Sequence, residues 1–593
     1  MLRGLRDLLP AHRAPRHRTG DALRDAPLLA EHRSPLWTDG RPEESALVAG
    51  KVHNLRVACR AFNGLVVPAG EVLSFWRQLG RPSRWRGFVV GREVRAGCVV
   101  PTVAGGLCQL SNALATAAVR AGIELVERHG HTARIEQATP TAGDAVDATV
   151  LWNYIDLRLR APFDIRLEVE LTADELVLRL RGESPRAPRP LLSIVDSRSG
   201  MRGAGAAASQ PGPHTARGCL TCDETACFRH GTGRALPSQG RRALLLNGWT
   251  PEWAQHLSTA DGDADWHLPW LRCARRGAGW WQPPAAARQH VAWLPSLRRT
   301  IALRRARGEG GSRQAALLRA DARLAAAAAK MLRPEHTELI VDQSLLVSLW
   351  RDGHLGGRQF DVLVSALPAQ ELQQRLDAAS RRCPNAPSLV DFRVDASYAE
   401  AELAALRAAR RVLTPHHEVV RYLTALGLEH VTQVPWHTAA DRAPAVTPKS
   451  RDATPLVVFP ASALPRKGVL EIAAALRHLG WRLRVLGSAA SDTELWQGVA
   501  VEHGRYADPS WLVEADVVAL PAHVEHAPRA LLKALAAGLP VVVTPACGLP
   551  PDSGAIEVPA GDVKALILAL QHAHATRAPG GRPAAIADAC GEP

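Results

Sequence analysis

The chain has 593 residues, of which 46% are hydrophobic and 22% charged, and its formal net charge is +14. One hydrophobic core does not support this length, so we expect several domains. The composition excludes a collagenous or mainly disordered protein, and no stretch approaches the roughly 20 apolar residues of a membrane-spanning helix.

The N-terminal segment, residues 1–33, is basic and contains neither a long apolar run nor a small-residue cleavage site. We therefore expect no secretory signal and a cytoplasmic location. The ten cysteines are irregularly spaced outside one cluster, which argues against a disulfide framework in such a compartment.

Residues 34–184 mix helical segments with alternating strand patterns. The run ATVLWNYIDLRLR, residues 148–160, indicates a strand. The run IRLEVELTADELVLRLRG, residues 165–182, contains two strand-like halves separated by a turn at 172–174, which predicts a hairpin. The Pro- and Arg-rich stretch that follows marks a domain boundary.

A candidate thiol site lies in this region. Cys108 follows a Gly pair and precedes a helix predicted to start near residue 110, so the helix dipole would favour its thiolate form. His129 and His131 follow the helix, and Asp147 and Asp156 lie on predicted strand segments. A Cys, His, Asp order is compatible with a nucleophile for acyl transfer or amide hydrolysis. A buried structural Cys with capping His residues is the alternative.

Three stretches in this region occur in the order of a known family. They are residues 51–88, 103–132 (VAGGLCQLSNALATAAVRAGIELVERHGHT) and 148–160. Together they closely resemble the VanW family of bacterial proteins associated with glycopeptide-resistance clusters. The biochemical activity of that family is not established, so the resemblance identifies the domain without implying a mechanism.

A cysteine cluster is embedded in the linker formed by residues 185–239. Its members are Cys219, Cys222, Cys227 and His230. Four such ligands can complete a tetrahedral shell, which predicts a structural zinc site. An iron–sulfur cluster is a weaker alternative because His ligation is less usual there. A zinc knuckle for nucleic acid is also disfavoured, since no interleaved aromatics accompany the spacing.

A basic stripe covers residues 272–323, with twelve Arg and two acidic residues. This excess suggests an anionic partner, and a solvated helix face is the alternative. Within it, Trp293, Leu297 and Ile301 recur at four-residue spacing with Arg between them. Such an amphipathic helix can lie on an anionic membrane, which would place the protein at the inner face of the membrane. An ordinary domain-packing helix is the alternative.

From residue 240 onward, short continuous apolar runs alternate with helical patterns. The runs are ALLLNGW, ELIVDQ, FDVLVSAL and RRVLTP, then, after a linker, PLVVFPAS, LRVLGS, ADVVALPA and PVVVTPA. Continuous runs are typical of parallel strands buried on both faces. We therefore predict two doubly wound α/β domains, residues 240–440 and 441–575, with a disordered tail at 576–593.

Two strand ends in the second α/β domain carry polar residues suited to a ligand. Arg466 and Lys467 precede a helix that starts near Gly468, and Glu525 lies in the loop before a helix whose first turn holds Pro528. In an open parallel sheet, ligands bind beyond the carboxyl ends of the strands, near helix N-termini.

This pattern resembles the donor-binding region of retaining GT-B glycosyltransferases, in which Lys-Gly marks one loop and two Glu residues mark another. The resemblance covers residues 455–565 well and 240–440 by the order of elements. It implies that Arg466 and Lys467 hold the diphosphate of a UDP- or GDP-sugar, that Glu525 contacts the donor sugar, and that amides near Gly548 and Leu549 face sugar or phosphate. Such enzymes need no metal ion, because cations and the helix dipole stabilise the leaving diphosphate.

The sequence departs from this pattern at two positions. Lys533 stands where the second Glu usually grips the ribose hydroxyls, and Ser462 stands where an Arg often begins the first motif. In the first α/β domain, Asp342, His354 and Asp361 lie near predicted strand ends and are candidates to meet an acceptor. Buried or solvated polar roles are the commoner alternative.

The sequence therefore predicts a multidomain protein with a mixed α+β VanW-like domain and two doubly wound, Rossmann-like α/β domains of the GT-B type. Its expected function is transfer of a sugar from a nucleotide-sugar donor to a cell-envelope or polysaccharide acceptor. One alternative is a cysteine-nucleophile acyl transferase or amidase acting on cell-wall peptide, with a degenerate GT-B binding module. The other is a non-enzymatic envelope-binding scaffold.

Overall fold

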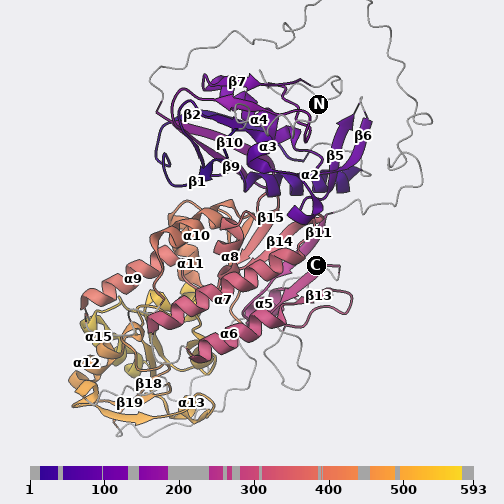
Figure 1. Cartoon of the computed structure of the whole chain (residues 1–593). Helices are drawn as coiled ribbons and strands as arrows, with labels where there is room; N and C mark the ends of the chain where they lie inside the picture. Colours follow the sequence, from indigo (N-terminus) through magenta and orange to yellow (C-terminus); the bar gives the residue numbers. More distant parts are fainter. Residues whose placement is uncertain are drawn as a thin grey trace, which may run out of the picture. The chain divides into compact units, whose positions relative to one another are not determined.

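The computed structural model describes most of the chain, in two compact units (Figure 1). The described residues are 14–37, 44–95, 98–130, 146–183, 240–257, 263–269, 281–305, 310–382, 384, 389, 392–437, 454–487 and 494–576. The first unit comprises Met1–Ala243, Met331–Leu339 and Leu349–Gln359, and the second comprises Leu244–Lys330, Ile340–Ser348 and Phe360–Pro593.

The N-terminal region is built on an antiparallel sheet of strand order β1-β3-β9-β10-β2. These strands are β1 Arg18–Thr19, β2 Leu28–Pro35, β3 Leu65–Val67, β9 Ile165–Leu171 and β10 Glu175–Gly182. Two smaller sheets contain β4 Val72–Ser74, β7 Glu124–Glu127 and β8 Arg158–Arg160, and β5 Val90–Arg95 with β6 Cys98–Val103. Its helices are α2 Ser45–Cys59, α3 Phe75–Leu79 and α4 Cys108–Arg120.

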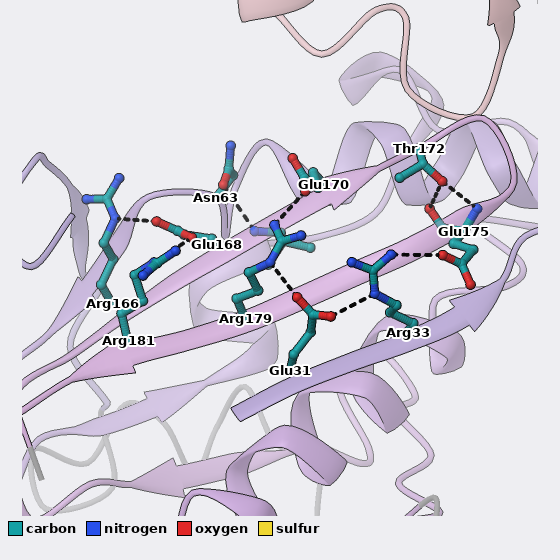
Figure 2. A network of polar contacts seen from close by, with 11 residues as sticks. Glu31, Arg33, Asn63, Arg166, Glu168, Glu170, Thr172, Glu175, Arg179 and Arg181 are labelled. Carbon is teal, nitrogen blue, oxygen red and sulfur yellow. Dashed lines mark hydrogen bonds and ion pairs between the residues drawn. The ribbon is translucent and has the colours of Figure 1, made fainter. Parts of the chain in front are cut away.

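The predicted hairpin is present as β9 and β10. Leu167 and Val169 on β9 and Leu180 on β10 face the core, while the alternate positions carry charges. Figure 2 shows these charges as a ladder across β2, β9 and β10, in which Arg179 donates to Glu31 (2.6 Å) and Glu170 (2.5 Å). Opposite charges at neighbouring strand positions stabilise the register of the sheet.

The predicted strand over residues 148–160 is only partly present. β8 covers its end, but Leu151 and Ile155 form an isolated bridge that closes a tight turn. Asn153 in that turn has φ 67°, a left-handed conformation that Asn tolerates better than most residues. The alternating pattern therefore came partly from a turn that exposes Trp152 and Tyr154, and neither Asp147 nor Asp156 lies in a strand.

The first α/β domain, described within residues 240–437, contains a seven-stranded sheet of order β13-β12-β11-β14-β15-β16-β17. Its strands are β11 Arg241–Leu245, β12 Asp265–Leu268, β13 Arg288–Val291, β14 His336–Asp342, β15 Gln359–Leu363, β16 Arg411–Thr414 and β17 Val431–Gln433. Its helices are α5 Pro251–Leu257, α6 Trp293–Arg305, α7 Gly310–Met331, α8 Gln343–Arg351, α9 Ala369–Arg382, α10 Ala396–Ala408 and α11 His417–Ala425.

The second α/β domain, residues 454–576, contains a wholly parallel sheet of order β20-β19-β18-β21-β22-β23. Its strands are β18 Leu456–Phe459, β19 Arg482–Val485, β20 Ala500–His503, β21 Val517–Leu520, β22 Val541–Val543 and β23 Ile556–Glu557. Its α-helices are α12 Val469–Leu479, α13 Ser510–Glu514, α14 Arg529–Ala536 and α15 Val563–Ala575. Helices α12 and α15 pack against one another (Figure 1).

In both parallel sheets the chain winds outward from a central strand and then reverses, β11 to β14 in one and β18 to β21 in the other. The predicted fold class is confirmed: an antiparallel-sheet domain precedes two doubly wound α/β domains. Ligands of such sheets bind where the order reverses, beyond the strand ends. No helix among the described residues is long and apolar enough to cross a membrane.

Candidate functional site

The two loops predicted to carry the donor site lie against each other. The loop after β18 ends in a 3-10 turn, Pro465–Lys467, and the carbonyl oxygen of Arg466 accepts from the N–H groups of His523 (3.0 Å) and Val524 (3.2 Å) after β21. Gly468 has φ 80°, and a Cβ there would lie 2.0 Å from the carbonyl oxygen of Pro521. Only glycine therefore allows this close approach.

Lys467 and Glu525 form an ion pair between these loops. The Lys467 Nζ donates to Glu525 Oε2 (2.9 Å) and to the carbonyl oxygen of Val524 (3.0 Å). The other carboxylate oxygen accepts from the N–H groups of His526 (2.8 Å) and Ala527 (2.9 Å). Burial alone would raise the pKa of Glu525, but the Lys467 charge and the Ala527 N–H outweigh it and hold the pKa below its usual value. Glu525 is therefore ionised at neutral pH.

Arg466 and His526 flank this ion pair around one aromatic ring. The Arg466 guanidinium carbon lies 5.1 Å from the centre of the Phe392 ring, and His526 meets the same ring edge-on at 6.0 Å. Burial and the nearby Lys467 lower the pKa of His526 to about 3, so its ring is neutral. The predicted cations Arg466 and Lys467 thus lie together with Glu525 where the strand order reverses.

A buried histidine of the first α/β domain reaches this site. His416, which follows β16, places its Nε2 2.9 Å from the carbonyl oxygen of Glu525. Because that oxygen can only accept, Nε2 carries the proton, and burial lowers the pKa of the ring. His416 was not predicted from the sequence, although its position directly after an apolar strand run is a signal that could have indicated it.

The segment around Gly548 also packs against the first α/β domain. Its carbonyl oxygen accepts from the N–H of His417 (3.0 Å) and from Trp436 Nε1 (3.2 Å). Gly548 has φ 62°, and a Cβ there would lie 2.1 Å from His416 Nδ1. The Gly548 N–H donates to Pro545 (2.9 Å), and Leu549 is buried. Donor contacts by the Gly548 and Leu549 amides remain a prediction.

A second ion pair joins the two α/β domains at the start of α14. Arg529 donates through Nη1 and Nη2 to the two carboxylate oxygens of Glu252 on α5, at 2.7 and 2.9 Å. The Glu252 side chain is buried, and the backbone N–H of His437 donates to it as well (3.3 Å). By contrast Lys533, four residues into the same helix, is exposed.

A buried polar cluster lies at the corresponding place in the first α/β domain, beyond β11 and β14. The Asn247 amide donates to Asp321 (3.1 Å) and Ser344 (2.8 Å), while Asp342, the last residue of β14, accepts from the Ser344 hydroxyl (2.7 Å). Burial raises the pKa of Asp321 to about 6, against the opposing effect of Arg299, and burial also raises the pKa of Asp342.

Of the three acceptor candidates, only Asp342 lies at the carboxyl end of a strand. Asp361 lies in the middle of β15 and is fully buried, where it pairs with Arg410 (2.9 Å) and Arg411 (2.6 Å). His354 precedes β15 at its amino end, in the first unit. The sequence did not indicate this ion pair, because a short apolar run does not show whether Asp361 lies within the strand or at its end.

Cys108 is the first residue of α4 and is partly exposed. Its Sγ lies 3.7 Å from Thr149 Oγ1 and 3.9 Å from the carbonyl oxygen of Val150. The backbone N–H of Thr149 donates to the carbonyl oxygen of His129 (2.7 Å), and His129 Nε2 lies 3.5 Å from Glu127. Thr149 therefore lies between Cys108 and the backbone of His129. His131 lies outside the described residues.

Two regions of the chain match known families. Residues 50–181 match the family described as VanW like protein, and residues 454–575 match the family described as Glycosyl transferases group 1. The chain carries a VanW-like domain and a group 1 glycosyltransferase domain. Both resemblances noted in the sequence are thereby confirmed.

The VanW-like domain also matches two bacterial proteins. The chain is 29% identical over 171 residues to the vancomycin B-type resistance protein VanW of Enterococcus faecalis, covering 28% of this chain and 62% of that protein. It is 31% identical over 112 residues to the uncharacterized protein YoaR of Bacillus subtilis, covering 19% of this chain and 36% of that protein. The chain thus spans less than two thirds of either relative.

Solved structures similar to the glycosyltransferase part include sucrose-phosphate synthase from Thermosynechococcus elongatus, at 15% identity and a TM-score of 0.37 over 57% of this chain and 90% of that chain. An α,α-trehalose-phosphate synthase from Burkholderia vietnamiensis matches at 13% identity and a TM-score of 0.35, over 57% and 91%. The Anabaena protein HepE in complex with UDP and glucose matches at 13% identity and a TM-score of 0.33, over 56% and 89%.

The predicted zinc ligands lie between the VanW-like and glycosyltransferase domains. Cys219, Cys222, Cys227 and His230 fall outside the described residues, so the zinc site remains a prediction. Among the residues that the structure does describe, no group of three or more His, Cys, Asp or Glu could hold a metal ion.

Proposed function

We propose that the glycosyltransferase domain moves a sugar from a UDP- or GDP-linked donor to a cell-envelope or polysaccharide acceptor. One observation supports this most directly: Arg466, Lys467 and Glu525 converge beyond β18 and β21, beside the N-terminus of α14. Two cations and a helix N-terminus provide the charge that a diphosphate needs.

In this proposal the donor diphosphate replaces Glu525 as the ion-pair partner of Lys467. The bond between the sugar C1 and the diphosphate oxygen breaks, its electron pair remains on the diphosphate, and Lys467 and Arg466 stabilise the negative charge that develops there. The acceptor hydroxyl oxygen bonds to C1, and its proton passes to the diphosphate oxygen that leaves C1. The released Glu525 faces the sugar, and we propose retention of the anomeric configuration.

Ligand-induced stabilisation tests the proposal. We expect UDP or GDP, at a concentration about a hundred times the dissociation constant, to stabilise the protein by about 3 kcal/mol, and Lys467→Ala to abolish the shift. Lys564→Ala, an exposed lysine on α15 of the same domain, is the matched control and should retain it. If no nucleotide or nucleotide-sugar stabilises the wild type, the domain binds no donor and the scaffold or thiol alternatives gain support.

Lys533 provides a second test of donor use. Because it is exposed on α14 where a ribose-binding Glu is expected, Lys533→Glu should raise nucleotide affinity about tenfold, as expected for a hydrogen bond to a charged group, while Lys533→Gln should not. Isothermal titration with UDP and GDP measures both. An unchanged affinity in both variants would show that the ribose lies elsewhere.

A second candidate activity concerns the VanW-like domain. We propose Cys108 as a thiol nucleophile for acyl transfer or amide hydrolysis on cell-wall peptide, supported by its partial exposure at the start of a 13-residue helix. Cys59 and Cys547 are buried, and burial raises the pKa of each to about 12. We expect iodoacetamide at pH 6.5 to label Cys108 well before these two, as measured by peptide mass spectrometry. Equal labelling of the three would contradict the proposal.

A further inference from the structure

Helix α6 is fixed to the protein by its polar side. Ser296 is buried, and its hydroxyl donates to the carbonyl oxygen of Pro269 (2.5 Å). Arg299, three residues on, lies 3.3 Å from Asp321 of the neighbouring helix α7 (Figure 1). Residues three apart lie on one side of a helix, so these contacts determine which side faces the protein.

The opposite side of α6 presents large apolar residues to solvent. The exposed fractions are 60% for Trp293, 40% for Leu294, 42% for Leu297 and 42% for Ile301. At 3.6 residues per turn these four side chains share an arc of about 100°. A surface helix normally turns its apolar side to the core. Helix α6 instead turns its apolar side to solvent and its polar side to the protein.

Exposed cations occur on α6, which carries this apolar arc, and on the neighbouring helix α7. Arg298, Arg304 and Arg305 are exposed on α6, and Arg319 and Arg323 are exposed on α7. The sequence from 281 to 331 contains only two acidic residues, and the one that the structure describes is already paired with Arg299. The surface therefore combines exposed apolar side chains with an unbalanced positive charge.

We propose that this face of α6 docks on an anionic lipid bilayer, with Trp293, Leu297 and Ile301 among the lipid headgroups. Charge complementarity favours this occupant. A second copy would bring arginines against arginines, and the undescribed segment 184–239 holds seven arginines and three acidic residues, so neither complements the face. The inference does not depend on the proposed sugar transfer.

Co-sedimentation of the full chain with lipid vesicles tests this docking. We expect binding to vesicles of phosphatidylcholine with a quarter phosphatidylglycerol, weaker binding as salt rises, and little binding to pure phosphatidylcholine. The variant Leu297→Ser/Ile301→Ser should lower the partition coefficient at least about tenfold. Leu568→Ser, on α15 and 67% exposed, is the matched control and should bind as the wild type does.

The charged part of the face needs its own variant. Arg304→Gln/Arg305→Gln should reduce binding to the anionic vesicles several-fold, whereas Arg381→Gln, an exposed position on α9, should not. Unchanged melting temperatures would show that the variants fold. No binding by the wild type, equal binding to both vesicles, or a double Ser variant that binds normally would each overturn the proposal. Self-association lost in the double Ser variant would assign the face to a second copy instead.

Discussion

The two parallel sheets reverse their strand order in the same way, but the residues at the two reversal points differ in charge. Beyond β18 and β21, Lys467 pairs with an ionised Glu525. Beyond β11 and β14, Asn247 and Ser344 surround Asp321 and Asp342, whose pKa values are raised by burial. The topology thus provides the same location twice. At one location a phosphate could replace Glu525 as the partner of Lys467, whereas at the other the buried carboxylates are held by Asn247, Ser344 and Arg299 and offer no cation to a phosphate.

The largest effect that tests this contrast should come from Gly468. Gly468→Ala places a Cβ 2.0 Å from the Pro521 oxygen at φ 80°, so we expect a loss of about 3 kcal/mol in the free energy of unfolding, together with loss of nucleotide binding. Gly480→Ala has φ 66° and open space around it, and should cost about 1 kcal/mol. Urea unfolding measures both changes in the free energy of unfolding. Equal losses in the two variants would mean that the loops after β18 and β21 are not held together at Gly468.

A smaller effect should appear in the pH dependence of stability. Asp321 has a folded pKa of about 6, above its unfolded value of about 4. Between pH 4 and 6 the folded state therefore binds more protons, so Asp321 makes stability fall by about 1–3 kcal/mol as pH rises. Asp321→Asn should remove that fall.

His526 should act in the opposite direction. Its folded pKa of about 3 lies below the unfolded value of about 6.5, so the unfolded state binds more protons in this interval and stability falls as pH drops. His526→Gln should weaken that acid-side loss. Thermal melting between pH 4 and 7 distinguishes the effects of the two residues on stability. If Asp321→Asn and His526→Gln changed the pH dependence of the melting temperature in the same direction, the contrast between the sheets would be contradicted.

The smallest effect concerns the ion pair between Arg529 and Glu252. Because Arg529 is partly exposed while Glu252 is buried, we expect a coupling energy of about 1 kcal/mol in a double-mutant cycle of Glu252→Gln and Arg529→Gln. A coupling of zero would show that the pair adds nothing to the association of the two α/β domains.

The sequence predicted the elements that bury continuous apolar runs. β14, β15, β18, β21 and β22 fall where such runs predicted strands, since central parallel strands need apolar residues on both faces. The strands β12, β13, β17, β20 and β23 were missed, because their sequences DWHL, RQHV, VTQ, AVEH and IE contain polar residues and form no continuous apolar run. In the VanW-like domain, hairpin β9–β10 was predicted from its alternation, but the turn at Asn153 was taken for a strand.

The residues proposed for the donor site were predicted where a loop motif indicated them. Arg466, Lys467 and Glu525 follow strand runs, and the structure brings them together, while their contacts with a donor remain a prediction. Contacts made across the two α/β domains were not found: His416 and Glu252 have no sequence pattern that indicates a partner more than 100 residues away. Only the folded chain determines such pairs.

The position of Arg529 has a mechanical consequence. It is the first residue of α14, four residues after Glu525, and its partner Glu252 belongs to the other α/β domain. Any hinge movement that separates these domains must pull on the amino end of the helix beside the ion pair of Lys467. If the domain binds a nucleotide as proposed, separation of the two α/β domains and loss of the Lys467 contact would therefore be coupled through Arg529.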